Sequence, residues 1–241
     1  MPQKERLDKI LASQGVGSRK EVHKLIWAGR VSVNGKTAKL TDTKIDPEKD
    51  ELRLDGEVIS YKKYIYIMMN KPMGVISASG NSAERTVIDL LPPELQRRGL
   101  FPAGRLDKDT TGLLIITNDG EFGHRLTAPN KQVYKTYEAT LDSPLTESGM
   151  EQLRQGVTID GGEQCRPAEV KLLSEDGLLA EIRICEGKYH QIKRMTEAVG
   201  CRVVALRRRG IGGLFLGGSL SEGQCRELTE EEKQLLFVKE L

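Results

Sequence analysis

Short apolar runs recur at irregular intervals along most of this chain, and they constrain its fold more than any other feature. The runs with the length and composition of strands occupy residues 64–69, 113–117, 133–141, 167–173, 178–184, 202–207 and 214–216. Segments with helical spacing lie at 86–91, 120–126, 146–155, 190–199 and 229–236. Because strands and helices do not alternate regularly, the pattern predicts an α+β fold rather than a repeated βαβ unit.

The N-terminal part of the chain shows a different pattern, with two segments of amphipathic helical spacing. A Ser-x-x-Glu capping box at residues 18–21 marks the start of the second helix. Asn34-Gly35 lies between short strand-like segments and signals a β-hairpin. A short polar link follows at residues 60–63. These features predict a small domain at residues 1–60 and a larger domain at residues 61–241.

The loop at residues 104–112 places charged side chains directly before an apolar run. Asp107 lies near the fixed cation Arg105, and the run Leu113–Ile116 follows Gly112. A carboxylate held at the end of a rigid strand is a plausible nucleophile. A hydrogen-bonded turn uses the same residue types, so local chemistry alone leaves both interpretations open.

Composition argues against several classes of function. The cysteines form no Cys-x-x-Cys pair, so we expect neither a metal site nor a disulfide framework. They are Cys165, Cys185, Cys201 and Cys225. No apolar run is long enough to span a membrane, and the first residues lack the apolar core of a signal peptide. We therefore expect a cytoplasmic protein that does not associate with membranes.

Charge is unevenly distributed along the chain, although the formal net charge is only +2. Basic residues gather at 1–40 and 202–209, whereas acidic residues gather at 42–57 and 227–232. Segregated charge can form a basic face that binds nucleic acid, although a solvated helix surface has the same composition. Trp27 ends the second predicted helix, and we expect it in the core rather than as a stacking surface for RNA.

Four segments, taken in order, resemble the motifs of RNA pseudouridine synthases of the RsuA family. They are Met69–Gly74, Gly104–Gly112, Tyr134–Tyr137 and Gly187–Met195. Residues 6–35 resemble an S4 RNA-binding domain. The resemblance implies an S4-type α/β domain, followed by a synthase domain with a mixed, mostly antiparallel sheet and flanking helices.

The resemblance also implies catalytic roles for individual residues. Asp107 is the nucleophile, and Lys193 is the basic residue that pairs with it and keeps it ionised. Tyr137 packs on the target base and assists proton removal. Ile192 forms part of a dry wall around that base, which strengthens the ionic contacts inside the pocket.

The same resemblance implies contacts with RNA. Arg105, next to the nucleophile, contacts the RNA and helps to hold the target base in its flipped position. His190 either orients the start of its helix or contacts the substrate. Further basic residues are candidates for phosphate contacts, namely Lys71, Arg194, Arg207, Arg208, Arg209, Arg6, Lys9, Arg19 and Lys20.

The activity implied by the resemblance is the isomerisation of uridine to pseudouridine. The bond from ribose C1′ to base N1 breaks, and a bond from C1′ to C5 forms. No atom is lost and no redox change occurs, so no cofactor is required. The resemblance is closest to the members that act on 16S ribosomal RNA, through the segments His190–Arg194, His124–Thr127 and Ile211–Leu214. It therefore implies 16S rRNA, free or in a pre-ribosomal small-subunit particle, as the partner of a monomeric enzyme.

Two alternatives remain open. The same reaction could act on large-subunit 23S rRNA, because synthases of that group also carry an S4-like module. A non-catalytic S4-type RNA-binding protein is the second alternative. The presence of Asp107, Tyr137 and Lys193 argues against it.

Overall fold

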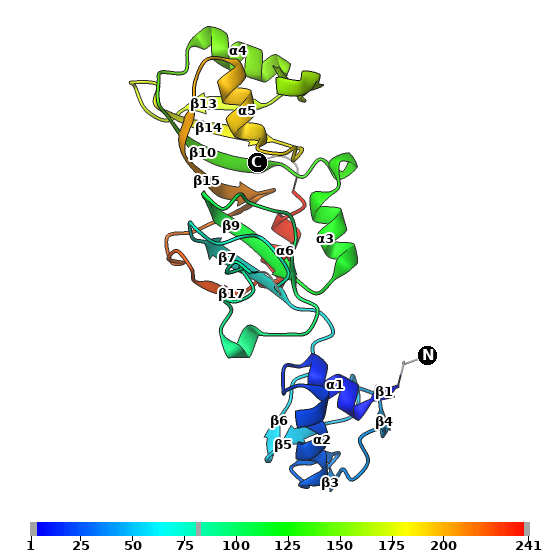
Figure 1. The fold of residues 1–241 in the computed structure, drawn as a ribbon. Coiled ribbons are helices and arrows are strands. Elements are labelled where there is room, and N and C mark those ends of the chain that lie inside the picture. Colours follow the sequence, from blue (N-terminus) through cyan, green and yellow to red (C-terminus); the bar gives the residue numbers. More distant parts are fainter. Residues whose placement is uncertain (1–3, 81–82, 239–241) are drawn as a thin grey trace. The chain divides into compact units, whose positions relative to one another are not determined.

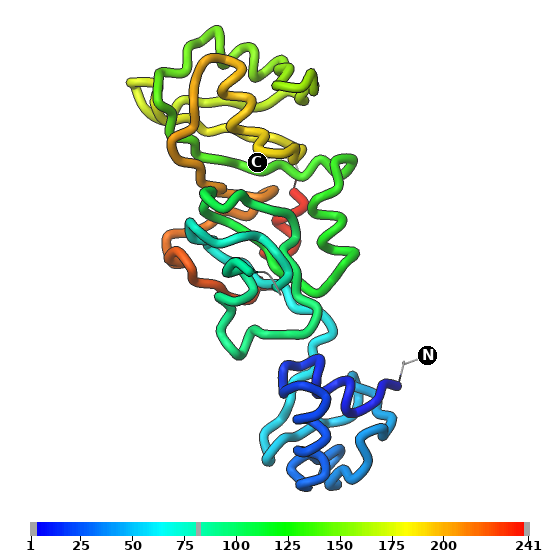
Figure 2. Tube along the Cα trace, viewed as in Figure 1, coloured from blue at the N-terminus to red at the C-terminus, as the bar shows by residue number. Residues whose placement is uncertain are grey.

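The computed structural model describes residues 4–80 and 83–238 (Figure 1). The chain divides into two compact units, one of residues 1–65 with 91–100 and the other of residues 66–90 with 101–241. Figure 2 traces the chain through both. The smaller unit thus extends five residues past the expected limit at 60 and includes a returning segment. The two outer ends of the expected domains lie outside the described residues.

The smaller unit packs two helices against short antiparallel strands. Its elements are β1 (Glu5–Arg6), α1 (Leu7–Ser13), α2 (Arg19–Trp27), β2 (Val31–Val33), β3 (Lys36–Thr37), β4 (Lys44–Ile45), β5 (Leu52–Leu54), β6 (Glu57–Val58) and the 3₁₀ helix η1 (Pro93–Leu95). One sheet has the order β3-β2-β5-β6, and β1 pairs with β4. Buried residues of both helices, including Leu7, Leu11 and Ile26, form the core with Val31 and Leu52.

The capping box and the hairpin turn of this unit form as the sequence predicts. The Ser18 side chain accepts a hydrogen bond from the Glu21 N–H, and the Glu21 carboxylate accepts one from the Ser18 N–H. Asn34 and Gly35 have φ of 49° and 75°, as a type I′ hairpin turn requires. The expectation for Trp27 is wrong, because its side chain is 69% exposed. It follows the buried Ile26 by one residue, which rotates it about 100° away from the core face.

The larger unit is built on one central sheet. Its elements are β7 (Tyr66–Lys71), β8 (Phe101–Pro102), β9 (Thr110–Thr117), α3 (Gly120–Thr127), η2 (Pro129–Lys131), β10 (Lys135–Leu141), α4 (Glu147–Gln155), β11 (Thr158–Ile159), η3 (Asp160–Gly162), β12 (Glu163–Gln164), β13 (Glu169–Leu172), β14 (Leu179–Ile184), α5 (Gln191–Ala198), β15 (Val203–Ile211), β16 (Leu214–Phe215), β17 (Cys225–Glu227) and α6 (Glu230–Leu235). Among the described residues the sheet follows the order β13-β14-β10-β15-β9-β7-β17, with β16 beside β15 and β8 beside β9.

The sheet is mixed and mostly antiparallel, which confirms the expected fold class. Strands β9 and β15 pair in parallel, with Thr110 opposite Leu206 and Gly112 opposite Arg208. The other ladders of the sheet path are antiparallel. Figure 1 shows α4 and α5 beside the part of the sheet that contains β10, β13 and β14, and α3 and α6 beside the part that contains β7 and β9. Each part has its own hydrophobic core.

Two local predictions need correction. Residues 86–91 form turns rather than a helix, because the Asp89 carboxylate accepts hydrogen bonds from both the N–H and the hydroxyl of Thr86. Such side-chain bonds compete with helical hydrogen bonds. Strand β17 was missed, because its Cys-Arg-Glu sequence lacks an apolar run. It is a strand because it pairs with β7, with Cys225 opposite Met69.

Replacing Gly112 with alanine should destabilise the larger unit. Gly112 has φ of 104°, and a Cβ atom there would lie 2.2 Å from the carbonyl oxygen of Arg208 on β15. Backbone strain and overpacking together predict a loss of about 2–6 kcal/mol of unfolding free energy, measured by urea denaturation. Gly120→Ala is the control, because nothing lies within 4 Å of its added Cβ and its φ is not in the left-handed region. Equal stability of the two variants would contradict this account of the β9–β15 contact.

Candidate active site

Asp107 lies in the loop between β8 and β9, and the backbone on both sides of it is fixed. Before it, the Ser77 hydroxyl donates to the Leu106 carbonyl and accepts from the Leu106 N–H, at 2.9 and 3.1 Å. After it, the Thr110 N–H donates to the Asp107 carbonyl at 3.1 Å. The loop therefore presents the Asp107 side chain, which is 31% exposed, from a rigid base.

Lys71 fixes the same loop through hydrogen bonds to its backbone. Its side chain is fully buried, and Nζ donates to the carbonyl oxygens of Pro72 and Thr110 at 3.0 and 2.9 Å. A longer bond of 3.4 Å reaches the Lys108 carbonyl. Burial lowers the pKa of the Lys71 ammonium to about 8. The expectation that Lys71 contacts phosphate is therefore corrected, because a buried ammonium bonded to backbone carbonyls cannot reach RNA.

Helix α5 brings two cationic or ionisable side chains to Asp107. Lys193 Nζ lies 3.4 Å from Asp107 Oδ2, and His190 Nε2 lies 3.5 Å from Asp107 Oδ1. His190 is the N-cap of α5 and has a left-handed backbone, with φ of 48°. The structure thus brings together Asp107 and Lys193, as the sequence predicts, and adds His190 to their contacts.

Asp109 is a site residue that the sequence analysis missed. Lys193 Nζ lies 2.6 and 2.8 Å from its two carboxylate oxygens, which is closer than its distance to Asp107. Hydrogen bonds from Lys193 hold the pKa of Asp109 below its usual value. The available signal was the Asp-Lys-Asp sequence, which places two carboxylates on one loop. One ammonium is therefore shared between the nucleophile candidate and a more exposed carboxylate.

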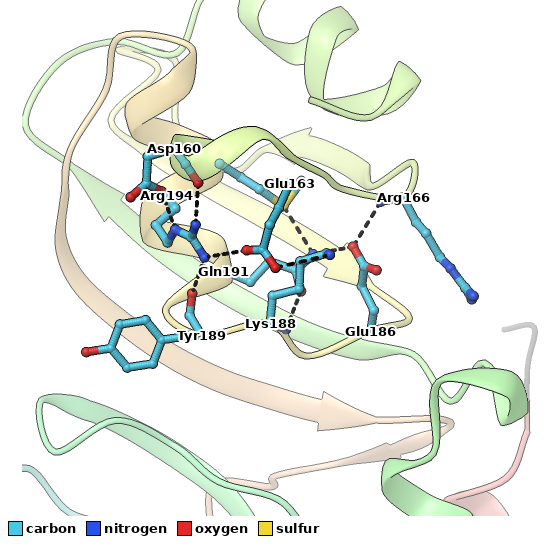
Figure 3. A network of polar contacts seen from close by, with 9 residues as sticks. Asp160, Glu163, Arg166, Glu186, Lys188, Tyr189, Gln191 and Arg194 are labelled. Carbon is cyan, nitrogen blue, oxygen red and sulfur yellow. Dashed lines mark hydrogen bonds and ion pairs between the residues drawn. The ribbon is translucent and has the colours of Figure 1, made fainter. Parts of the chain in front are cut away.

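A polar network fixes the loop that precedes α5 (Figure 3). The Arg194 guanidinium contacts the carboxylates of Asp160 and Glu163 and donates to the Tyr189 carbonyl at 3.1 Å. The buried Gln191 side chain accepts from the Lys188 N–H at 2.9 Å and donates to Glu186. In this structure Arg194, the candidate for a phosphate contact, is 17% exposed and uses its guanidinium for bonds within the protein.

An open pocket of about 380 Å³ lies over Asp107. It is lined by Met73, Gly74, Asp107, Lys108, Asp109, His190 and Lys193. A second hollow of about 170 Å³ shares Met73 and Asp109 with it and continues over Thr111, Glu138 and Arg207. The larger pocket has room for a small group such as a nucleobase.

Among the described residues, neither Tyr137 nor Ile192 lines this pocket. Ile192 is 3% exposed and packs within a hydrophobic cluster, so a wall around the target base stays a prediction for this residue. Tyr137 is half-buried and packs against the same cluster. The Arg208 guanidinium lies 6.0 Å from the Tyr137 ring centre. Arg208 is itself buried and donates to the Leu113 carbonyl, so it does not contact phosphate.

The remaining basic candidates differ in their solvent exposure and in their ion pairs within the protein. Arg105 is exposed, and so are Arg19 and Lys20, none of which forms an ion pair among the described residues. Arg6 is bonded through two nitrogens to the buried Asp8, and Lys9 pairs with Glu5 at 2.7 Å. Arg207 lines the second hollow, and its buried Nε has no hydrogen-bond partner among the described residues. Arg209 Nη1 lies 3.3 Å from Glu138 Oε2.

Within residues 4–80 and 83–238, no group of three or more His, Cys, Asp or Glu side chains is arranged to hold a metal ion. Over the same residues, every helix is too short or too polar to span a bilayer.

The chain is similar to known proteins along almost its whole length. Residues 65–198 match the RNA pseudouridylate synthase family and residues 5–52 match the S4 domain. An uncharacterised RNA pseudouridine synthase of Bacillus subtilis is 48% identical over 96% of this chain and 98% of its own length. The ribosomal small subunit pseudouridine synthase A of Vibrio cholerae is 39% identical over 94% of this chain and 97% of its own.

Two further comparisons bear on substrate and fold. The ribosomal large subunit pseudouridine synthase B of Bacillus subtilis is 36% identical, over 96% of this chain and 95% of its own. A crystal structure of a pseudouridylate synthase matches with a TM-score of 0.67 and 36% identity, over 96% of this chain and 99% of that one. Since the family match spans more than half of the residues and the relatives align nearly end to end, the chain belongs to the RNA pseudouridine synthase family and carries an N-terminal S4 domain.

Proposed function

We propose that this enzyme converts one uridine of 16S ribosomal RNA to pseudouridine, with Asp107 as nucleophile. The observation that carries the proposal is the placement of Asp107 in an open pocket, with Lys193 and His190 on either side of its carboxylate. The small-subunit enzyme of Vibrio cholerae supports the choice of RNA, at 39% identity. A role in ribosome assembly agrees with the cytoplasmic location expected from the sequence.

The geometry fits the bond changes of the reaction. The target uridine leaves its helix and enters the pocket, at a cost of a few kcal/mol in lost stacking. The Asp107 carboxylate bonds to the substrate as a transient adduct, the C1′–N1 bond breaks and the base rotates. C1′ then bonds to C5, and the bond to Asp107 breaks to release the carboxylate. The C5 proton is then removed and N1 gains a proton, so the atoms balance. Lys193 supplies fixed positive charge beside the carboxylate throughout.

Rigid support limits the motion of the nucleophile during these steps. Ser77 and Lys71 bond the backbone on either side of Asp107, and the Arg194 network holds the start of α5. Misplacement by about 1 Å can cost about 10²-fold in rate. By resemblance, Tyr137 is the candidate to pack on the target base.

Large-subunit rRNA is the second candidate substrate. It is supported by the similarity to the large-subunit enzyme of Bacillus subtilis, at 36% identity, only slightly below the identity to the small-subunit enzyme. The residues around Asp107 do not discriminate between the two RNAs, because phosphate and base-flipping contacts carry little sequence information.

Mapping pseudouridine in both rRNAs of a strain that lacks the gene tests the proposal. We expect one 16S position to lose its pseudouridine and wild-type protein to restore it. Asp107→Asn should bind RNA but leave the position unmodified, because the amide cannot act as a charged nucleophile. Loss of a 23S position would favour the second candidate, and restoration by Asp107→Asn would remove Asp107 from the mechanism.

Lys193→Met should lower kcat by about 10²- to 10³-fold, as expected for the loss of one preorganised charge at a reacting group. Lys193→Arg should recover part of the rate, because it keeps the charge but alters its position. Lys171→Met is the matched control, since Lys171 is an exposed lysine on β13. The measurement is the single-turnover rate of each variant with saturating RNA. Similar rates for Lys193→Met and Lys171→Met would contradict the role of Lys193.

The S4 unit should contribute phosphate contacts through α2. Arg19 and Lys20 are exposed at its start, and Lys20 shares a helical face with the exposed Trp27. Arg19→Ala/Lys20→Ala should weaken rRNA binding and make its salt dependence shallower by about two units of slope. Trp27→Ala should weaken binding with little change of slope, because stacking releases few counterions. The measurement is the affinity of each variant for rRNA across a salt series, with Lys171→Ala as the control. Unchanged slopes would show that this face is only solvated.

A further inference from the structure

Tyr189 is a large aromatic side chain at the surface, and it precedes the pocket residue His190 in the chain. Its side chain is 73% exposed, and its ring stacks on that of His190 with 3.8 Å between centres and an interplanar angle of 18°. One face of Tyr189 is therefore covered by His190, and most of the ring remains in solvent. An aromatic ring so exposed adds little to the hydrophobic core.

The backbone under this pair is held in place. The Tyr189 carbonyl accepts from Arg194, which is in turn bonded to Asp160 and Glu163. His190 adopts a left-handed backbone, which costs about 1–3 kcal/mol in a residue other than glycine and persists where surrounding structure enforces it. In Figure 3 the Tyr189 ring projects away from the network that anchors its backbone.

The pair reaches the pocket over Asp107 through His190, on which the Tyr189 ring stacks. His190 lines that pocket, and its Nε2 lies 3.5 Å from the carboxylate. When a uridine is flipped into the pocket, the bases next to it lose a stacking neighbour. RNA-binding proteins commonly offer aromatic rings to such unstacked bases.

We propose that the free face of Tyr189 stacks on an unpaired base of the substrate RNA directly beside the target uridine. The ring replaces the stacking that the flipped uridine no longer provides. Tyr189 is a recognition residue in this role, and Arg194 and His190 are positioning residues that hold its ring. The inference rests on the RNA pseudouridine synthase activity but not on the identity of the rRNA.

The first test compares Tyr189→Ala, Tyr189→Phe and wild type on a short RNA that wild type modifies at one uridine. Loss of one stacked base predicts a fall in kcat/KM of about 5- to 150-fold for Tyr189→Ala. Tyr189→Phe should stay within about threefold of wild type, because it keeps the ring. The RNA is taken from 16S or 23S rRNA, whichever wild type modifies, so a wrong substrate assignment does not affect this test.

The second test separates stacking from a structural role of Tyr189. The base on one side of the target, and then on the other, is replaced by an abasic nucleotide. At one of these positions the difference between wild type and Tyr189→Ala should vanish, because the partner of the ring is already absent. A difference that persists undiminished on both abasic RNAs would overturn the proposal, and so would equal loss of activity in Tyr189→Phe.

Discussion

The close approach of β9 and β15 at Gly112 is the constraint on which the site depends. These strands pair in parallel, and the backbone of Arg208 passes so near Gly112 that no side chain fits between them. Asp107 lies just before β9, and Lys193 lies on the helix that precedes β15. The parallel pairing therefore places the start of one strand beside the helix that leads into the other. Without this pairing, Asp107 and Lys193 would lie in separate halves of the sheet.

Three sets of polar contacts then convert this arrangement into a rigid site. Ser77 and Lys71 fix the loop of Asp107, and the network around Arg194 fixes the start of α5. Each uses a buried or half-buried polar group to bond backbone carbonyls, which are directional acceptors. The ammonium of Lys193 joins the two fixed parts through Asp107 and Asp109. Preorganisation of this kind avoids rearrangement when charge develops during reaction.

The sequence predicted those features that depend on short segments. The central strands, the capping box at Ser18 and the Asn34-Gly35 turn all follow from local pattern, and the structure contains them. The burial of Lys71 could not be predicted, because its carbonyl partner at Thr110 is 39 residues away. The contact of Lys193 with Asp109 spans 84 residues. The prediction for Trp27 was wrong although its signal is local. It followed from the large apolar side chain, whereas the helical phase of the residue directs that side chain outward.

Strand β17 has a consequence for how the chain folds during synthesis. It pairs with β7, so the last strand of the sheet covers the edge of the first long one. β7 is rich in buried apolar residues, including Ile67, Met68 and Met69. A growing chain must therefore expose an apolar strand edge until residue 227 leaves the ribosome, and such edges invite pairing with other chains. Chaperones that bind extended apolar segments should thus be needed most by chains that end just before β17.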